Sequence, residues 1–176
     1  MLIKNIIISF ILSLFLDGQG NRGYIVEIGD MAPNFTLKTS ENKYFSLEDY
    51  RGKIIMLQFT ASWCSVCLKE MPFIEDEIWN KHKKNDDFIL LALAKDTDKR
   101  RQGINEIELM RKKTGVTYPI ESDWNSEIFN LFAEKKAGVT RNIIINKDGE
   151  IAFLTRLFDK DEFNEMKKII EDLLAK

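Results

Sequence analysis

The chain contains 176 residues, of which 44% are hydrophobic and 31% are charged. This composition is typical of one globular domain and excludes a largely disordered chain. Lys and Arg number 26 against 28 Asp and Glu, giving a net charge of -2, so the chain lacks the basic field that attracts a protein to nucleic acid. Two Cys and one His are too few for a tetrahedral zinc site built from these residue types.

The first twenty residues differ in composition from the rest. Lys4 precedes an apolar run over residues 6–16. A membrane-spanning helix needs about 20 apolar residues, whereas a shorter run after a positive charge fits the central region of a secretory signal. We therefore expect residues 1–20 to be a signal peptide or N-terminal anchor, and residues 27–176 to form the folded domain. The alternative is that the apolar run is a buried element of the fold.

In chain order, the remaining sequence alternates short strands with helices. The longer apolar runs are typical of strands buried on both faces of a sheet, and Asp148-Gly149 is a hairpin turn signal. The expected strands are 35–38, 44–47, 54–59, 88–94, 142–146 and 151–155. The expected helices are 66–84, 99–113, 127–132 and 160–174. A mixed sheet with helices on both faces is the simplest closure of this order.

A Cys-x-x-Cys motif, Cys64 to Cys67, lies between the expected strand 54–59 and the helix that follows. A zinc pair would need two more ligands of suitable type, and His82 alone remains. A structural disulfide closing so short a loop would stabilise the fold by only about 2 kcal/mol. Redox chemistry is the favoured interpretation, because this motif at a helix start in a β-α-β setting is typical of dithiol oxidoreductases.

The position of the motif explains how redox chemistry would work. Unpaired N–H groups and the helix dipole favour an anion at Cys64, so we expect its thiol pKa to be lowered. A lowered pKa also makes Cys64 a better leaving group when Cys67 attacks a mixed disulfide. Cys67 lies one turn inside the helix, and we expect it to be the more buried thiol that resolves that intermediate.

The sequence around the motif resembles a known family. Residues 29–37, 47–53 and 59–72 are similar to exported thioredoxin-like disulfide oxidoreductases of the TlpA/ResA type, within the wider redoxin superfamily. The resemblance covers about residues 28–175. It implies an α/β thioredoxin fold, with a mixed central sheet flanked by helices and an added N-terminal β-hairpin.

The resemblance also implies roles for residues beside the motif. It makes Cys64 the nucleophile and Cys67 the resolving thiol, and it matches Glu70 to an acidic residue that tunes proton transfer. Trp63 matches the aromatic residue that flanks the motif, and Pro72 matches a proline that kinks the helix. The alternatives are an ordinary exposed helix residue for Glu70 and a core residue for Trp63.

Two positions depart from the thioredoxin pattern. Gln58 stands six residues before Cys64, where thioredoxins carry a buried Asp, so the base must be Glu70, water or another group. Thr140 stands where a cis-proline is expected, and we expect a trans bond there because a cis bond before Thr would cost about 2.5–4 kcal/mol. The Val139 backbone and the Thr140 hydroxyl are then the expected contacts to a partner. Arg141 beside them is a candidate for stabilising a thiolate or an acidic partner, with a solvated Arg as the alternative.

The expected activity is thiol-disulfide exchange through Cys64 and Cys67 with partner proteins outside the cytoplasm, as a reductant. The expected partners are disulfide-bearing or dithiol proteins, and the resemblance implies a membrane-bound thiol electron donor. We expect a periplasmic or membrane-associated monomer without a metal or other cofactor. One alternative is a peroxiredoxin-like peroxidase, although Leu57 and Ala61 break the Pro-x-x-x-Thr-x-x-Cys pattern of that class. Another is a thioredoxin-fold binding module whose disulfide does not turn over.

Overall fold

The computed structural model describes residues 21–176, so the expected signal segment 1–20 lies outside the described residues. The strands are β1 (Thr36–Lys38), β2 (Tyr44–Ser46), β3 (Ile54–Thr60), β4 (Phe88–Lys95), β5 (Ile120–Asp123), β6 (Arg141–Ile145) and β7 (Ile151–Arg156). The α-helices are α1 (Ser65–Ile74), α2 (Asn80–His82), α3 (Ile104–Thr114), α4 (Phe129–Phe132) and α5 (Lys160–Leu174). A π-helical segment, Glu75–Trp79, joins α1 to α2. None of the helices within 21–176 has the length and apolar character needed to cross a bilayer.

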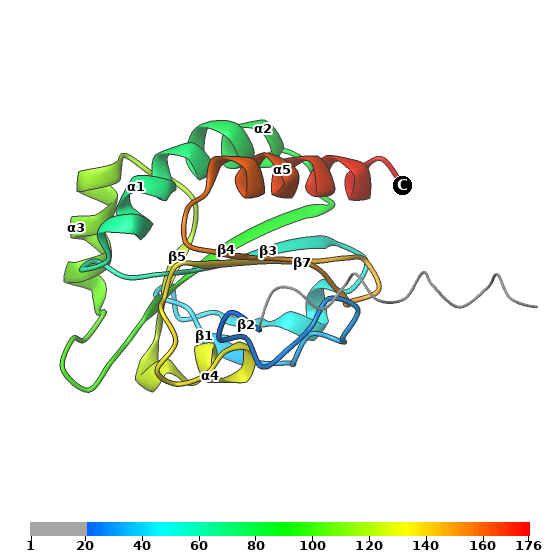
Figure 1. Ribbon diagram of the computed structural model, residues 1–176. Helices are drawn as coiled ribbons and strands as arrows, with labels where there is room; N and C mark the ends of the chain where they lie inside the picture. Colours follow the sequence, from blue (N-terminus) through cyan, green and yellow to red (C-terminus); the bar gives the residue numbers. More distant parts are fainter. Residues whose placement is uncertain (1–20) are drawn as a thin grey trace, which may run out of the picture.

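The central sheet has five strands in the order β5-β4-β3-β6-β7. Strands β3, β4 and β5 run parallel, whereas β6 is antiparallel to both β3 and β7. Helices α1, α2 and α5 lie on one face of this sheet, and the β1–β2 hairpin and α4 lie on the other (Figure 1). The expected mixed sheet with helices on both faces and a separate N-terminal hairpin is confirmed.

Alternating side chains of the strands build a separate core on each face. On β3, Ile55, Leu57 and Phe59 join the core beneath the sheet with the hairpin and α4. Ile54 and Met56 join the core above it, with α1, α3 and α5. Side chains alternate between the two faces along a strand. The same alternation therefore decides which core the polar side chains of β3 and β6 face.

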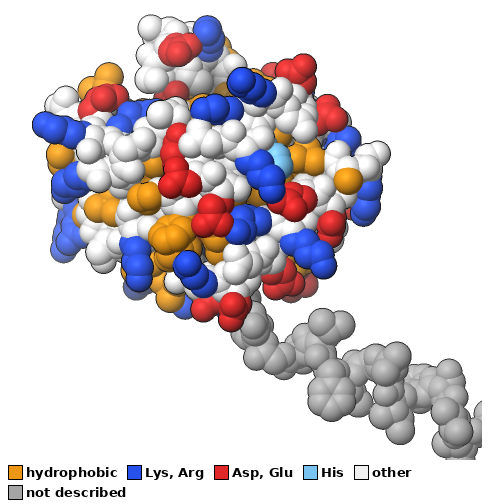
Figure 2. All heavy atoms as spheres, turned by 90° about the horizontal axis from the view of Figure 1, so that it is seen from above, with side chains coloured by type: hydrophobic (Ala, Val, Ile, Leu, Met, Phe, Trp, Pro, Cys, Tyr) orange, Lys and Arg blue, Asp and Glu red, His pale blue; other side chains and the backbone are white. Residues whose placement is uncertain are grey.

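The helices above the sheet also contact each other through their polar faces. Lys81 pairs with Glu171, and Lys167 with Glu77, so that the α1–α2 region is joined to α5. Figure 2 shows the molecule from this side, with acidic and basic side chains interspersed rather than gathered in patches of one sign. This face therefore shows no broad basic surface of the kind that binds a polyanion.

Helix α1 carries Pro72 in its interior, and the π-helical segment starts at Glu75. Proline has no N–H to donate within a helix, and its ring clashes with the carbonyl four residues earlier. The π-helical turn that follows is a local widening of the helix. The N–H of Glu75 points to the carbonyls of both Met71 and Pro72. Cys64 at the N-cap and Cys67 in the first turn both precede Pro72.

The start of one helix and the presence of one strand differ from expectation. Helix α3 begins at Ile104, not near residue 99, because Asp96 holds the preceding chain in a loop: its carboxylate accepts from the Gln102 N–H at 2.8 Å and pairs with Arg101 at 2.5 Å. Strand β5 was not expected from the sequence. Its four residues, Ile120–Asp123, contain a single strongly apolar side chain and acquire strand structure by pairing with β4.

Candidate active site

The two cysteines form a disulfide at the start of α1. Cys64 is the N-cap residue and is partly buried, whereas Cys67 is fully buried one turn further on. Their Cα atoms are 5.3 Å apart. The backbone N–H of Cys67 donates to the Cys64 Sγ at 3.2 Å, so the sulfur occupies the place of a capping acceptor. This geometry favours negative charge at Cys64 once the bond is reduced.

Thr140 approaches both sulfurs from the loop that precedes β6. Its Oγ1 lies 3.2 Å from the Cys64 Sγ and 3.1 Å from the Cys67 Sγ. Neither sulfur of a disulfide carries hydrogen, so the hydroxyl is the only possible donor in these contacts. There is no cis peptide bond within residues 21–176, which agrees with the expected trans bond before Thr140.

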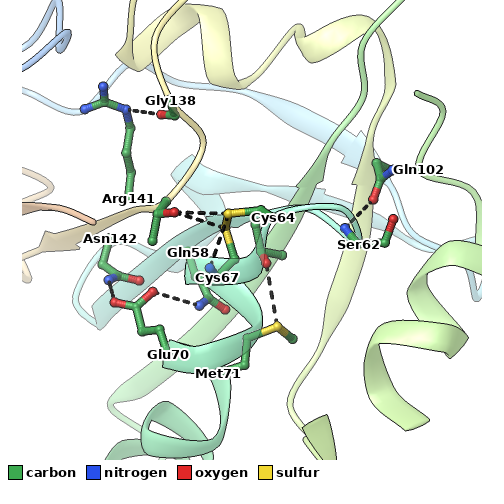
Figure 3. The surroundings of a disulfide bond; sticks show 12 residues. Gln58, Ser62, Cys64, Cys67, Glu70, Met71, Gln102, Gly138, Arg141 and Asn142 are labelled. Atoms are coloured by element: carbon green, nitrogen blue, oxygen red, sulfur yellow. Dashed lines mark hydrogen bonds between the residues drawn. A yellow bond between two sulfur atoms is a disulfide. The ribbon is translucent and has the colours of Figure 1, made fainter. Parts of the chain in front are cut away.

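Glu70 lies beneath the disulfide on α1, and it is buried rather than exposed to solvent. Its carboxylate accepts from the Asn142 Nδ2 at 2.7 Å and from the Gln58 Nε2 at 3.5 Å (Figure 3). Burial raises the pKa of Glu70 to about 7, although both amides oppose the shift by stabilising the charged form. A carboxyl with such a pKa exchanges its proton near neutral pH.

The strand register explains how the two amides reach Glu70. Gln58 of β3 is paired with Asn142 of β6, and both side chains point to the α1 face. Each is fixed by a further bond, since the Tyr118 hydroxyl donates to the Gln58 Oε1 at 2.9 Å and the Asn142 Nδ2 donates to the Thr155 Oγ1 at 2.9 Å. Sequence reasoning missed Asn142, Tyr118 and Thr155. The available signal was that Gln58 and Asn142 are polar residues in strands that are otherwise apolar.

Arg141 does not face the disulfide, which corrects the expectation that it acts on a thiolate or an acidic partner. It alternates with Asn142 along β6 and therefore points to the opposite face of the sheet. There it is fully buried, stacked 4.2 Å from the Tyr24 ring centroid. Its guanidinium donates to the carbonyls of Gly138 at 2.9 Å and Arg22 at 2.7 Å. Arg141 thus stabilises the loop that carries Thr140, from the face of the sheet opposite the disulfide.

The surface beside Cys64 is formed by Trp63 and the backbone before Thr140. The Trp63 ring is 39% exposed, and the guanidinium carbon of Arg100 lies 4.9 Å from its centroid. The side chain of Val139 is buried. No backbone group of Val139 takes part in a hydrogen bond within residues 21–176.

No group of three or more His, Cys, Asp and Glu side chains within residues 21–176 is arranged to hold a metal ion. The chemically distinctive groups of the site are the two sulfurs, the Thr140 hydroxyl and the Glu70 carboxyl.

A family model described as Redoxin matches residues 27–172. The chain belongs to the Redoxin family. Among curated proteins, the thiol-disulfide oxidoreductase ResA of Bacillus cereus is 30% identical over 155 residues, which cover 85% of this chain and 84% of that protein.

Solved structures of other proteins share the architecture. A solution structure from Bacteroides thetaiotaomicron, described as a proposed protein disulfide isomerase, has 46% sequence identity and a TM-score of 0.80, covering 88% of this chain and 94% of that one. A secreted disulfide oxidoreductase of Mycobacterium tuberculosis has 17% identity and a TM-score of 0.60, covering 79% and 96%. The fold of this Redoxin protein is therefore thioredoxin-like with an added N-terminal hairpin, as expected. The protein is a thiol-disulfide oxidoreductase with a Cys64–Cys67 pair, and its reaction implies protein thiols as partners.

Proposed function

We propose that this Redoxin protein reduces disulfide bonds of partner proteins outside the cytoplasm. The observation that carries the proposal is the placement of Cys64: a partly exposed sulfur at the N-cap of α1, joined to a fully buried Cys67. The Cys64 sulfur can react with a partner disulfide, and the buried Cys67 sulfur can then resolve the mixed disulfide.

The reaction proceeds in two exchanges. The Cys64 thiolate attacks one sulfur of a partner disulfide, forming a mixed disulfide and releasing the other partner sulfur as a thiolate. Cys67 then loses its proton and attacks the Cys64 Sγ, which forms the Cys64–Cys67 bond and releases the second partner thiolate. The partner gains two electrons, and the Cys64–Cys67 dithiol is oxidised to the disulfide seen in the structure.

Glu70 is the proposed acceptor of the Cys67 proton. The two residues lie three positions apart on α1, so their side chains occupy one face of the helix. A pKa of about 7 leaves the Glu70 carboxyl partly ionised at neutral pH and able to take up a proton. Glu70 thereby takes the role that a strand carboxylate fills in thioredoxins, where this chain has Gln58.

The electrostatics of the sulfurs favour a reductant. Within residues 21–176, the hydrogen bonds to the two sulfurs come from the Cys67 N–H and the Thr140 hydroxyl, both of them neutral donors. Arg141, which follows Thr140 in the chain, points to the other face of the sheet, and the Arg100 guanidinium lies over the Trp63 ring rather than donating to a sulfur. A thiolate without a cationic partner is only moderately stabilised, and a less stabilised reduced form corresponds to a more negative potential.

Trp63, the Val139 backbone and Thr140 are the proposed contact residues for the partner. The exposed Trp63 ring offers apolar area next to Cys64. The free amide and carbonyl of Val139 can pair with an extended segment of the partner, in the way that a strand adds to an open edge. These contacts would align a partner sulfur with Cys64.

The N-terminal sequence supports the proposed location, and the proposed electron donor is the one that the family resemblance implies. The charged start and the apolar run of residues 1–20 match a secretory signal or anchor. Outside the cytoplasm, a membrane-bound thiol donor would return the Cys64–Cys67 pair to its reduced form after each turnover. We propose that the protein acts there as a monomer. Fusing residues 1–20 to alkaline phosphatase, which is active only after export, tests the location: loss of activity on deleting residues 6–16 is expected, and an inactive full fusion would contradict export.

Reduction of insulin by the dithiothreitol-primed protein tests the activity. We expect wild type to reduce insulin, Cys64→Ser to be inactive and Cys67→Ser to accumulate mixed disulfides. A Cys64–Cys67 potential near -270 mV supports a reductant, and one near -120 mV would identify an oxidase instead. Absence of both insulin reduction and trapped partners would leave a binding module. The similarity to the Bacteroides protein makes isomerisation the second candidate, which refolding of scrambled ribonuclease would reveal.

A further inference from the structure

We propose that the Thr140 hydroxyl is a hydrogen-bond donor that follows the negative charge from Cys64 to Cys67 during exchange, and that its main effect is on the resolving step. This inference rests on the proposed function. It gives Thr140 a chemical role at the sulfurs, in addition to contact with a partner.

The geometry allows one hydroxyl to serve both sulfurs. The Oγ1 of Thr140 is 3.2 Å from the Cys64 Sγ and 3.1 Å from the Cys67 Sγ, so the hydrogen can turn from one sulfur to the other without movement of heavy atoms. Thr140 is only 3% exposed. Water therefore competes little for the hydroxyl, and a hydrogen bond to a charged sulfur is strong in such surroundings.

The loop around Thr140 is held from two sides, which keeps the hydroxyl in place. The Thr140 carbonyl accepts from the Leu157 N–H at 3.0 Å. The Arg141 guanidinium binds the Gly138 carbonyl at 2.9 Å. A donor fixed in this way loses little conformational entropy when it binds a thiolate, because its position is set before the charge appears.

The two sulfurs depend on this hydroxyl to different degrees. Cys64 also receives the Cys67 N–H at 3.2 Å and lies at the helix N-terminus. Cys67 is fully buried, and within residues 21–176 the Thr140 hydroxyl is the single donor in contact with its sulfur. A buried anion without a hydrogen-bond donor is strongly destabilised. Removal of the Thr140 hydroxyl should therefore destabilise the Cys67 thiolate more than the Cys64 thiolate.

The charge moves as follows in the reducing direction. Before attack, the thiolate is on Cys64 and Thr140 donates there. In the mixed disulfide the Cys64 sulfur is neutral, and Cys67 passes its proton to Glu70. Thr140 then donates to the Cys67 thiolate until that sulfur bonds to Cys64 and the partner thiolate leaves. Two electrons pass to the partner, as in the overall exchange.

Stopped-flow reaction of the reduced full chain with 5,5′-dithiobis(2-nitrobenzoate) separates the two steps. The first equivalent of thionitrobenzoate reports attack by Cys64, and the second reports resolution by Cys67. Replacing Thr140 with Val keeps the shape and removes the hydroxyl. We expect Thr140→Val to slow the second release at least about tenfold and the first less than about threefold, given the usual strength of a hydrogen bond to a charged group. Thr140→Ser keeps the hydroxyl and should stay within about twofold of wild type.

The pH dependence of the second release separates this role from a purely structural one. Loss of the donor should shift the midpoint of that phase upward by about one pH unit in Thr140→Val, because a tenfold loss of thiolate stabilisation corresponds to one unit. Circular dichroism checks folding, and Thr140→Ala serves as a second variant without the hydroxyl if Thr140→Val does not fold.

Three results would overturn the inference: unchanged rates in Thr140→Val, equal slowing of both phases, or a Thr140→Ser variant as slow as Thr140→Val. A wild type that releases both equivalents but fails to reduce insulin would instead contradict the proposed function, and the comparison of Thr140 variants would still be interpretable.

Discussion

Glu70 combines burial with two neutral hydrogen-bond donors, and this combination links its ionisation to folding. The unfolded chain has an ordinary Glu pKa of 4.5, whereas burial raises the pKa of Glu70 in the folded protein to about 7. Between these values, the folded state binds more protons than the unfolded state. The free energy of unfolding therefore falls as pH rises from about 4.5 to about 7, and the full loss is about 3 kcal/mol.

Glu70→Gln should remove this part of the pH dependence. Gln has no charge to bury, and its amide oxygen can still accept from Asn142. Relative to wild type, we expect the variant to gain about 3 kcal/mol of unfolding free energy between pH 4.5 and pH 8. Urea denaturation of the oxidised proteins at the two pH values measures the change.

Exposed Glu165 provides the control, since Glu165→Gln also removes one carboxyl. Burial also raises the pKa of Asp123, to about 6, but Asp123 is present in every variant and its contribution cancels in the comparison. Parallel pH curves for wild type and Glu70→Gln would show that the Glu70 carboxyl is not perturbed by burial.

At the residue scale, sequence reasoning predicted the nature of the site but not all of its contacts. The Cys-x-x-Cys spacing predicted that Cys64 caps α1 and that Cys67 is the more buried sulfur, and the structure confirms both. The expectation that Arg141 acts on a thiolate or an acidic partner was wrong, because alternation along β6 places it on the opposite face from Asn142, and the alternative of a solvated Arg was wrong because the side chain is fully buried. The partners of Glu70 depend on the register of β3 against β6, which a single sequence does not reveal.

Helix α5 shows how local signals define an element. Asp159 is its N-cap, and the Oδ1 of Asp159 accepts from the N–H groups of Asp161 and Glu162, both at 3.0 Å. Phe163, Met166 and Ile170 recur at helical spacing and are buried against the sheet. Cap and periodicity agree, so the expected range 160–174 matches the structure.

Asp159→Ala should lower the free energy of unfolding by about 1 kcal/mol, because two N–H groups lose their acceptor. Asp159→Asn keeps an acceptor oxygen and should lose much less. Urea unfolding monitored by far-ultraviolet circular dichroism would compare the three proteins. Equal losses in the Ala and Asn variants would point to the charge at the helix start, rather than the cap bond, as the stabilising feature.

Other elements depend on contacts that no local pattern announces. Ile120–Asp123 has neither an apolar run nor clean alternation, and β5 exists through its pairing with β4. The start of α3 is delayed by the loop around Asp96, whose carboxylate binds Arg101 and the Gln102 N–H. In both cases tertiary contacts override local preference, as is common for short edge strands and helix starts.

For the molecule as a whole, the disulfide contributes little to the fold. It closes a loop of four residues, for which the chain-entropy model gives about 2 kcal/mol, whereas two hydrophobic cores cover both faces of the sheet. We expect the dithiothreitol-reduced protein to remain folded and to lose at most about 2 kcal/mol of unfolding free energy. Urea titrations with and without dithiothreitol test this, and the double variant Cys64→Ser, Cys67→Ser should not respond to the reductant. Loss of the folded signal on reduction would show that the link is structural.

The closeness of the two sulfur-bearing residues, with Cα atoms 5.3 Å apart and the inner one sealed from solvent, also bears on chemical damage. A peroxide that reached the reduced site would meet Cys64 and convert its thiolate to a sulfenic acid. Cys67 would then displace hydroxide from that sulfur before a second oxidant arrived, with water as the product. The dithiol is thus protected against irreversible sulfinic and sulfonic acids by its own geometry, and ordinary thiol donors would suffice to repair it.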